Sequence, residues 1–286
     1  MKKTIFPLML CVGFLYACSG GQTGGETAEQ KEEPVAETTP VEEEPSEAKK
    51  LVMEMVAANG GVDKFNSLND VEFEYTYTDL LGNLSDVSTE RYIFDGEYSW
   101  AQYDVHDKFV MPGQEGSVIQ GYNGNECWST FAGAAVTDSA TMKMTDFLRK
   151  TNYYWFTMMY KLLDPGLTYE LQGKKTINDL EYDIVKVGFE GGVGDVQDTY
   201  VLYINPETKL VDQFLFTVLD FGIQDPLLMV VEYQDVDGVK VPSYRKYGPG
   251  SWEGDINPDG IWAAENHYKN VKFNNGFDKA SFEKPA

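Results

Sequence analysis

Alternation of polar and apolar residues, repeated in run after run, is the feature that most constrains the fold of this chain. In the stretch VEFEYTYTD, the side chains of Phe73, Tyr75 and Tyr77 face one way and those between them face the other. A period of two is the pattern of a β-strand with one buried face. About ten such runs are separated by turn formers such as the NPET at 205–208. Helical segments are too few for the crossovers of a parallel sheet, so the runs predict a large antiparallel sheet.

Residues 47–58 have the periodicity of an amphipathic helix instead. Their large apolar side chains fall on one helical face: Leu51, Val52, Met55 and Val56. The tripeptide NGG that comes next is a typical helix end. The sequence therefore predicts one helix ahead of the first strand.

Residues 145–163 form a second predicted helix, which is apolar around most of its circumference. Thr145 is a suitable N-cap, and the sequence DPG at 164–166 ends the segment. A helix that is apolar nearly all round is buried. We therefore expect a mainly β (α+β) fold, a large curved antiparallel sheet or half-barrel with an N-terminal helix and an apolar helix covering the concave face.

The N-terminus has the pattern of a secretory signal over residues 1–17. Lys2 and Lys3 precede an apolar stretch that ends at Ala17, and Cys18 follows at once. The sequence LYAC resembles the lipobox of bacterial lipoproteins. This resemblance implies cleavage before Cys18 and its diacylation, palmitate being a typical acyl group. An ordinary signal peptide with a chance cysteine is the alternative.

Residues 18–49 are expected to be a lipidated cysteine followed by a disordered acidic tether. Residues 19–49 hold nine Glu, two Lys and no aromatic residue, which is too little apolar surface for a core. Residues 50–286 are long enough for one domain with a substantial core. The formal net charge of −23 argues against nucleic acid and against adhesion to anionic headgroups.

Four motifs carry a family resemblance across most of residues 50–247. They are AANGGVDKFNSLNDVEFEY, YYWFTMMYKLLDPG, YVLYINPETKLVDQFLFTV and DGVKVPSYRKY. In their order they resemble a family of uncharacterised bacterial envelope lipoproteins, and in expected shape the LolA/LolB-like lipoprotein-carrier superfamily. The resemblance implies a half-barrel that holds acyl chains in an apolar hollow, and it brings no catalytic residue.

Ser19, directly after Cys18, resembles the residue found in lipoproteins sorted to the outer membrane. The expected location is therefore the bacterial outer membrane, with the domain held by the Cys18 acyl anchor and facing the periplasm. The sequence leaves surface exposure open.

Aromatic and methionine side chains on the predicted strands and the apolar helix are candidates for lining a ligand-binding hollow. Pockets are mostly apolar, and methionine adapts to irregular ligands. The candidates are Phe73, Tyr75, Tyr77, Trp100, Trp155, Phe156, Met159, Phe214 and Phe216. The expected partner is a lipid or other apolar molecule. Alternatively, these side chains fill the core, and the protein is a structural lipoprotein or binds an envelope protein.

The stretch DINPDG is a weak candidate for a metal site. Asp255, Asn257 and Asp259 have the spacing that opens a calcium loop, but the twelfth position is Asn266 where Glu would be expected. The sequence NPDG is also a strong type I turn. The turn is the favoured interpretation, and no cofactor is expected.

Signals of an enzyme are poor in this sequence, and its many acidic residues leave a paired-carboxylate hydrolase as the alternative. It has no G-x-S-x-G elbow, and only two histidines, His106 and His267, both expected on exposed strand positions. After loss of Cys11 and lipidation of Cys18, Cys127 remains, and we expect a buried, inert thiol. The sequence therefore predicts a protein without catalytic activity.

Overall fold

A computed structural model describes residues 44–191, 197–253 and 260–285. Contacts divide the chain into two units, Met1–Glu43 and Glu44–Ala286. The fold presented here is that of the second unit. The proposed signal peptide, Cys18 and nearly all of the proposed tether lie outside the described residues.

Thirteen strands of the described residues form one antiparallel sheet. Six strands precede the long helix: β1 Asp70–Asp79, β2 Leu84–Ile93, β3 Tyr98–His106, β4 Val118–Tyr122, β5 Cys127–Phe131 and β6 Ala134–Ala135. Seven come after it: β7 Leu167–Ile177, β8 Leu180–Phe189, β9 Tyr200–Ile204, β10 Val211–Val218, β11 Ile223–Val236, β12 Val239–Pro249 and β13 Ala264–Phe273. Their order across the sheet is β6-β5-β4-β3-β2-β1-β13-β12-β11-β10-β9-β8-β7.

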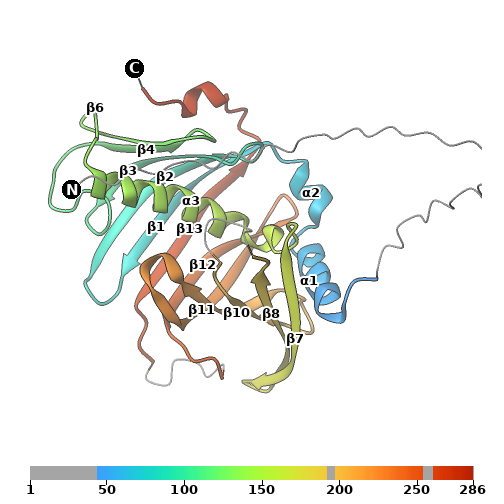
Figure 1. Cartoon of the computed structure of the whole chain (residues 1–286). Coiled ribbons are helices and arrows are strands. Elements are labelled where there is room, and N and C mark those ends of the chain that lie inside the picture. The colour runs from blue at the N-terminus through green and yellow to red at the C-terminus, as the bar shows by residue number, and fades with distance from the viewer. Residues whose placement is uncertain (1–43, 192–196, 254–259, 286) are drawn as a thin grey trace, which may run out of the picture. The chain divides into compact units, whose positions relative to one another are not determined.

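This order explains why a helix crosses the sheet. The first six strands run outward from β1 to one edge, and the next strand, β7, forms the opposite edge. The connection between the edges must therefore cross a face, and helix α3, Ser139–Lys161, does so on the concave side (Figure 1). The half-barrel and its covering helix, both predicted from the sequence, are confirmed.

Helix α3 begins six residues earlier than predicted. Its N-cap is Asp138, whose carboxylate accepts a hydrogen bond from the Thr141 backbone N–H at 2.9 Å. Thr145 lies inside the helix instead, buried, and its hydroxyl donates to the Thr141 carbonyl at 3.0 Å. The capping carboxylate, and not the start of the apolar run, sets the helix start.

Helix α1, Glu47–Ala58, matches its prediction and buries Val52, Met55 and Val56. The short helix α2, Val62–Asn66, and the 3-10 turns η1, Leu219–Phe221, and η2, Lys279–Phe282, were not predicted. Strands β4 and β6 were also missed. Elements of a few residues carry too few positions to show a period.

The hydrophobic core lies on both sides of α3. Along strands β8–β11 it extends to both faces of the sheet. One cluster joins α1 and α3 to strands β8–β11, and a second joins α3 to β1, β2, β12 and β13. A third cluster, which includes Tyr203 and Leu215, lies on the outer face of β8–β11, where Trp262 packs against it. The expectation of one buried face is therefore wrong for these strands, whose outer side chains pack on one another and on Ile177, Leu180 and Trp262.

Candidate ligand-binding cavity

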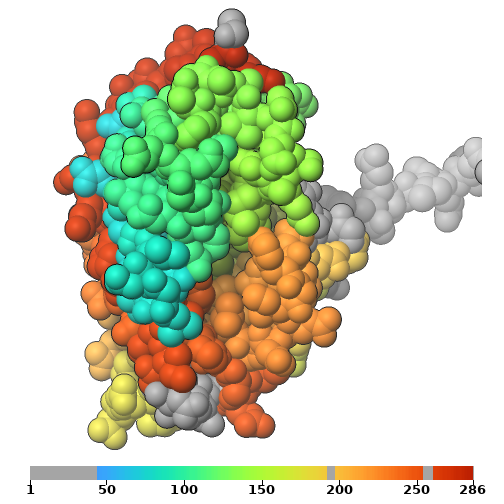
Figure 2. Space-filling view, turned by 90° about the vertical axis from the view of Figure 1, so that its left-hand side faces the viewer, coloured from blue at the N-terminus to red at the C-terminus, as the bar shows by residue number. Residues whose placement is uncertain are grey.

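A cavity of about 1010 Å³ lies between α3 and the concave face of the sheet. Its walls come from α3, from strands β1–β4 and β7–β13, and from the 3-10 turn η1. In Figure 2 the surface is hollowed between the green segments and the orange segment that includes η1 and the start of β11. The helix therefore covers the concave face without filling it.

Four of the nine side chains proposed as ligand-lining lie on the wall of this cavity: Tyr75, Tyr77, Trp155 and Phe216. Four others are buried in the core around it: Phe73, Phe156, Met159 and Phe214. Phe73 and Phe156 stack on each other with ring centroids 4.9 Å apart. The helix thus packs directly onto the sheet at one part of its length and stands off from it at another.

Trp100 does not lie in the cavity. Its neighbours Ser99 and Ala101 face α3, so the alternation of β3 turns the indole to the opposite face. There the guanidinium of Arg91 lies 4.7 Å from the ring centroid. Strand membership was predicted for Trp100, but the register that decides its face was not.

Tyrosine hydroxyls supply polar groups at the sheet side of the cavity. The hydroxyls of Tyr77 and Tyr247 are 2.8 Å apart, and the hydroxyl of Tyr75 accepts a hydrogen bond from Asn266 Nδ2. Burial raises the pKa of Tyr75 and of Tyr77 well above the ordinary value. These hydroxyls therefore stay neutral and keep their protons as donors.

Arg245 of β12 also lines the cavity, and sequence reasoning missed it. Its side chain is 1% exposed and donates to the Tyr268 hydroxyl at 2.8 Å and to the Trp155 carbonyl at 2.5 Å. Its Nε has no hydrogen-bond partner among the described residues. Along β12 the inner-cluster residues Val239 and Val241 and the cavity-lining Arg245 and Tyr247 occupy alternate positions of one face. The alternation could have placed Arg245 there, but a charged residue is not expected on a buried face.

A second buried cation, Arg149 of α3, is fully neutralised. Its guanidinium donates to both carboxylate oxygens of Glu90, at 2.7 and 3.0 Å, and both side chains are fully buried. The hydroxyls of Ser88 and Tyr92 donate to the same carboxylate. Burial alone would lower the pKa of Arg149, but the neighbouring Glu90 raises it above the ordinary value.

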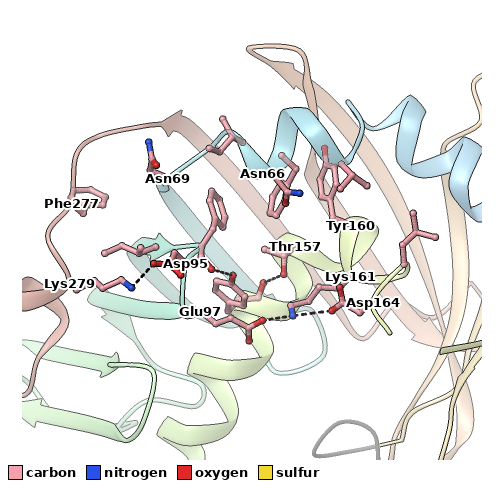
Figure 3. Close-up of a pocket in the computed structure, with 17 residues that line it drawn as sticks. Asn66, Asn69, Asp95, Glu97, Thr157, Tyr160, Lys161, Asp164, Phe277 and Lys279 are labelled. Carbon is pink, nitrogen blue, oxygen red and sulfur yellow. Dashed lines mark hydrogen bonds and ion pairs between the residues drawn. The ribbon is translucent and has the colours of Figure 1, made fainter. Parts of the chain in front are cut away.

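A smaller cavity of about 750 Å³ lies at the C-terminal end of α3 (Figure 3). Lys161 stands at its rim, where it pairs with Glu97 at 2.5 Å and with Asp164 at 3.4 Å. The same three residues and Tyr153 line the larger cavity too. The two cavities are therefore neighbours, with the Lys161 ion pairs between them.

The remaining candidates are the proposed metal ligands and the two histidines. Asp255, Asn257 and Asp259 lie outside the described residues, and the described part of the chain holds no group of three or more His, Cys, Asp or Glu suited to a metal. His106 is buried, contrary to prediction, because its ring reaches the Gly116 carbonyl at 2.9 Å. His267 is partly exposed, 3.5 Å from Glu265. None of the helices in the described residues has the length and hydropathy of a membrane span.

The chain is similar to one family of unknown function over part of its length and to several solved structures in its fold. A family model described as a family of unknown function, DUF6503, matches residues 120–224, which is less than half of the chain. The search of curated proteins found no match. A crystal structure of a DUF1329 family protein from Desulfovibrio piger is 14% identical, with a TM-score of 0.51, over 82% of this chain and 97% of that one.

Two further structures are similar at lower scores. A LolA superfamily protein from Nitrosomonas europaea is 10% identical, with a TM-score of 0.49, over 83% of this chain and 97% of that one. An outer membrane lipoprotein-sorting protein domain from Vibrio parahaemolyticus is 8% identical, with a TM-score of 0.48, over 82% and 94%. One of these similar structures is a member of the LolA superfamily, the resemblance expected from the predicted shape of the fold.

Proposed function

We propose that the protein binds or carries a lipid or other apolar molecule in the hollow of its half-barrel. The observation that carries the proposal is the cavity of about 1010 Å³ between α3 and the sheet. Its size is at the upper end of ligand pockets, which are mostly apolar with a few placed polar groups. The walls combine apolar rings such as Trp155 and Phe216 with the hydroxyls of Tyr75 and Tyr77 and with charged side chains.

We also propose where the protein is held. The signal-like residues 1–17 and the lipobox-like LYAC support a diacylated Cys18 as the membrane anchor, and Ser19 supports the outer membrane. The acidic segment 19–49 would act as a tether to a periplasm-facing domain of residues 50–286. The proposal includes no catalytic step.

The first test is mass spectrometry of organic extracts from the unit Glu44–Ala286, purified from a bacterial periplasm. We expect about one lipid or other apolar molecule per protein, retained through purification. An extract that stays empty after incubation with membrane lipids would contradict the proposal. It would favour a structural role or an envelope protein partner.

A matched pair of variants separates the cavity from the rest of the surface. Trp155 lines the cavity and packs on Phe216 with ring centroids 5.2 Å apart, while Trp100 lies on the opposite face. Trp155→Ala should weaken binding of a neutral naphthylamine dye by about tenfold, since an aromatic contact in a pocket contributes about 1.5 kcal/mol. Trp100→Ala should leave dye affinity unchanged, and equal losses in both variants would count against the cavity as the binding site.

A further inference from the structure

The three arginines of the chain differ in how their charge is compensated. Arg91 pairs with Glu72 at 2.7 Å on the outer face, and Arg149 pairs with the buried carboxylate of Glu90. Arg245 is as buried as Arg149, yet it pairs with no carboxylate in residues 44–191, 197–253 and 260–285. It is also the one arginine of the three that lines the large cavity.

The groups around Arg245 are neutral. A carbonyl and a tyrosine hydroxyl accept two of its five N–H bonds, and the rings of Trp155 and Tyr268 lie 5.7 and 5.4 Å from its guanidinium carbon. Guanidinium stays protonated in proteins, so the charge remains in place. Burial of a cation is costly unless it is paired, and hydrogen bonds and aromatic faces offset only part of this cost.

A second donor lies on the same wall. The Tyr75 hydroxyl accepts from Asn266, and its own proton has no acceptor among the described residues. Tyr75, Asn266 and Arg245 all line the cavity, and Tyr268 links them because its ring contacts Tyr75 and its hydroxyl accepts from Arg245. A group with two or more acceptor oxygens could bind both donors, and the planar fork of arginine suits carboxylate and phosphate.

The acidic residues that line the cavity do not take this role. Asp146 pairs with Lys150 and Asp164 with Lys161, while Asp86 accepts from the backbone N–H groups of Lys108 and Phe109. Asp198 accepts from Thr217 and from the backbone N–H of Leu219. Glu97 pairs with Lys161, and Asp220 is exposed on η1. None of these six carboxylates pairs with Arg245 in the described residues, so its charge is left without a counterion there.

We propose that the ligand is an amphiphile with an anionic head group, a carboxylate or a phosphate, that binds Arg245 inside the cavity while the acyl chain lies along the aromatic wall. This inference rests on the proposed function and specifies its ligand. It also sets the orientation of the ligand, since Arg245 lies on β12 beside Trp155, in the C-terminal half of α3.

The test compares ligands that share one chain and differ in their head group. Each displaces the neutral naphthylamine dye from the delipidated unit Glu44–Ala286, which holds every helix, strand and core cluster described. The ligands are hexadecanoate, hexadecyl phosphate, hexadecanol and hexadecyltrimethylammonium. We expect at least one anion to bind about tenfold or more tighter than hexadecanol, because hydrogen bonds to charged groups are stronger than those to neutral groups. The two anions together distinguish a carboxylate ligand from a phosphate ligand.

Variants then assign the preference to one side chain. Arg245→Gln should bring both anions to within about twofold of hexadecanol, whose own affinity should change little. Arg245→Lys keeps the charge and should keep part of the preference, which guards against a folding defect in the glutamine variant. Arg91→Gln removes an equal charge from the outer face and should leave the preference unchanged.

The outcomes separate the two proposals. Dye binding with equal affinity for anions and hexadecanol, or with a preference for the ammonium, overturns the head-group proposal and leaves an apolar binding site. A preference for anions that persists in Arg245→Gln also overturns it. No binding of the dye or of any amphiphile overturns both proposals.

Discussion

At the scale of single residues, the most consequential feature is the buried pair of Glu90 and Arg149. The charge of each side chain neutralises the charge of the other, and both side chains are fully buried where α3 meets β2. Neither residue stood out in the sequence, where both belong to ordinary mixed segments. Their contribution to stability arises only where the tertiary structure brings them together.

Replacing one partner of this pair should destabilise the unit strongly. We expect Glu90→Gln to cost about 3–5 kcal/mol, because it leaves the Arg149 charge buried without a counterion. The control is Glu72→Gln, which breaks the pair with the half-exposed Arg91 and should cost about 1 kcal/mol or less. Urea unfolding followed by circular dichroism measures both, and similar small losses would show that water reaches Arg149.

The thiol of Cys127 should be unreactive in the native protein. Cys127 is only partly buried, and not fully buried as predicted. Even so, desolvation, and next the nearby Asp146, raise the pKa of this thiol to about 12. At pH 8 the group is therefore almost wholly protonated, and the thiolate is the reactive form. In the unit Glu44–Ala286, where Cys127 is the sole cysteine, iodoacetamide should label slowly until denaturant is added. Rapid native labelling at pH 8 would point to an activated thiol.

At the scale of elements, the packing of β4 against β5, next to the edge strand β6, requires a glycine at position 121. A Cβ added to Gly121 of β4 would lie 2.4 Å from the indole of Trp128 on β5. That indole cannot move freely, because its Nε1 donates to the Phe282 carbonyl at 2.8 Å and both side chains are buried. The contact between Trp128 and Phe282 thereby holds η2 against the sheet.

Gly121→Ala should therefore destabilise the unit by about 1–3 kcal/mol through overpacking. Gly191→Ala is the control, since no described atom lies within 4 Å of its added Cβ, and it should stay within about 0.5 kcal/mol. Chemical denaturation gives both values. An unchanged free energy of unfolding in Gly121→Ala would mean that Trp128 shifts without cost.

At the scale of the whole molecule, the pairing of β1 with β13 joins the beginning and the end of the domain. Because these strands are adjacent at the middle of the sheet, both halves must be present before either is complete. The core clusters all lie within Glu44–Ala286. A unit with its own core is able to fold alone.

We accordingly expect Glu44–Ala286, expressed without residues 1–43, to unfold in one cooperative transition with the same Tm as the longer chain. Removal of residues 264–286, which begin with β13, should abolish this transition, since β1 and β12 would both lose their central partner. Calorimetry checks both. A large loss of Tm on removing residues 1–43 would assign them a structural role.

The sequence by itself determined the local features of this protein. Strand periodicity in VEFEYTYTD, the amphipathic 47–58 segment and the apolar run before DPG each encode an element within a few residues, because propensity and burial pattern act over one or two turns. From these the antiparallel sheet and its covering helix could be predicted, and Tyr75, Tyr77, Trp155 and Phe216 could be placed among the candidates for the cavity wall.

Only the tertiary structure decided how the elements meet. The face taken by Trp100, the burial of His106 and the place of Arg245 beside Trp155 depend on strand register, on the bulge where β2 pairs with β3 and on contacts between residues far apart in the chain. Whether α3 fills the concave face or stands off from it depends on side chains from both halves of the sheet at once. A one-residue change in register turns a side chain to the other face, and no local pattern carries that information.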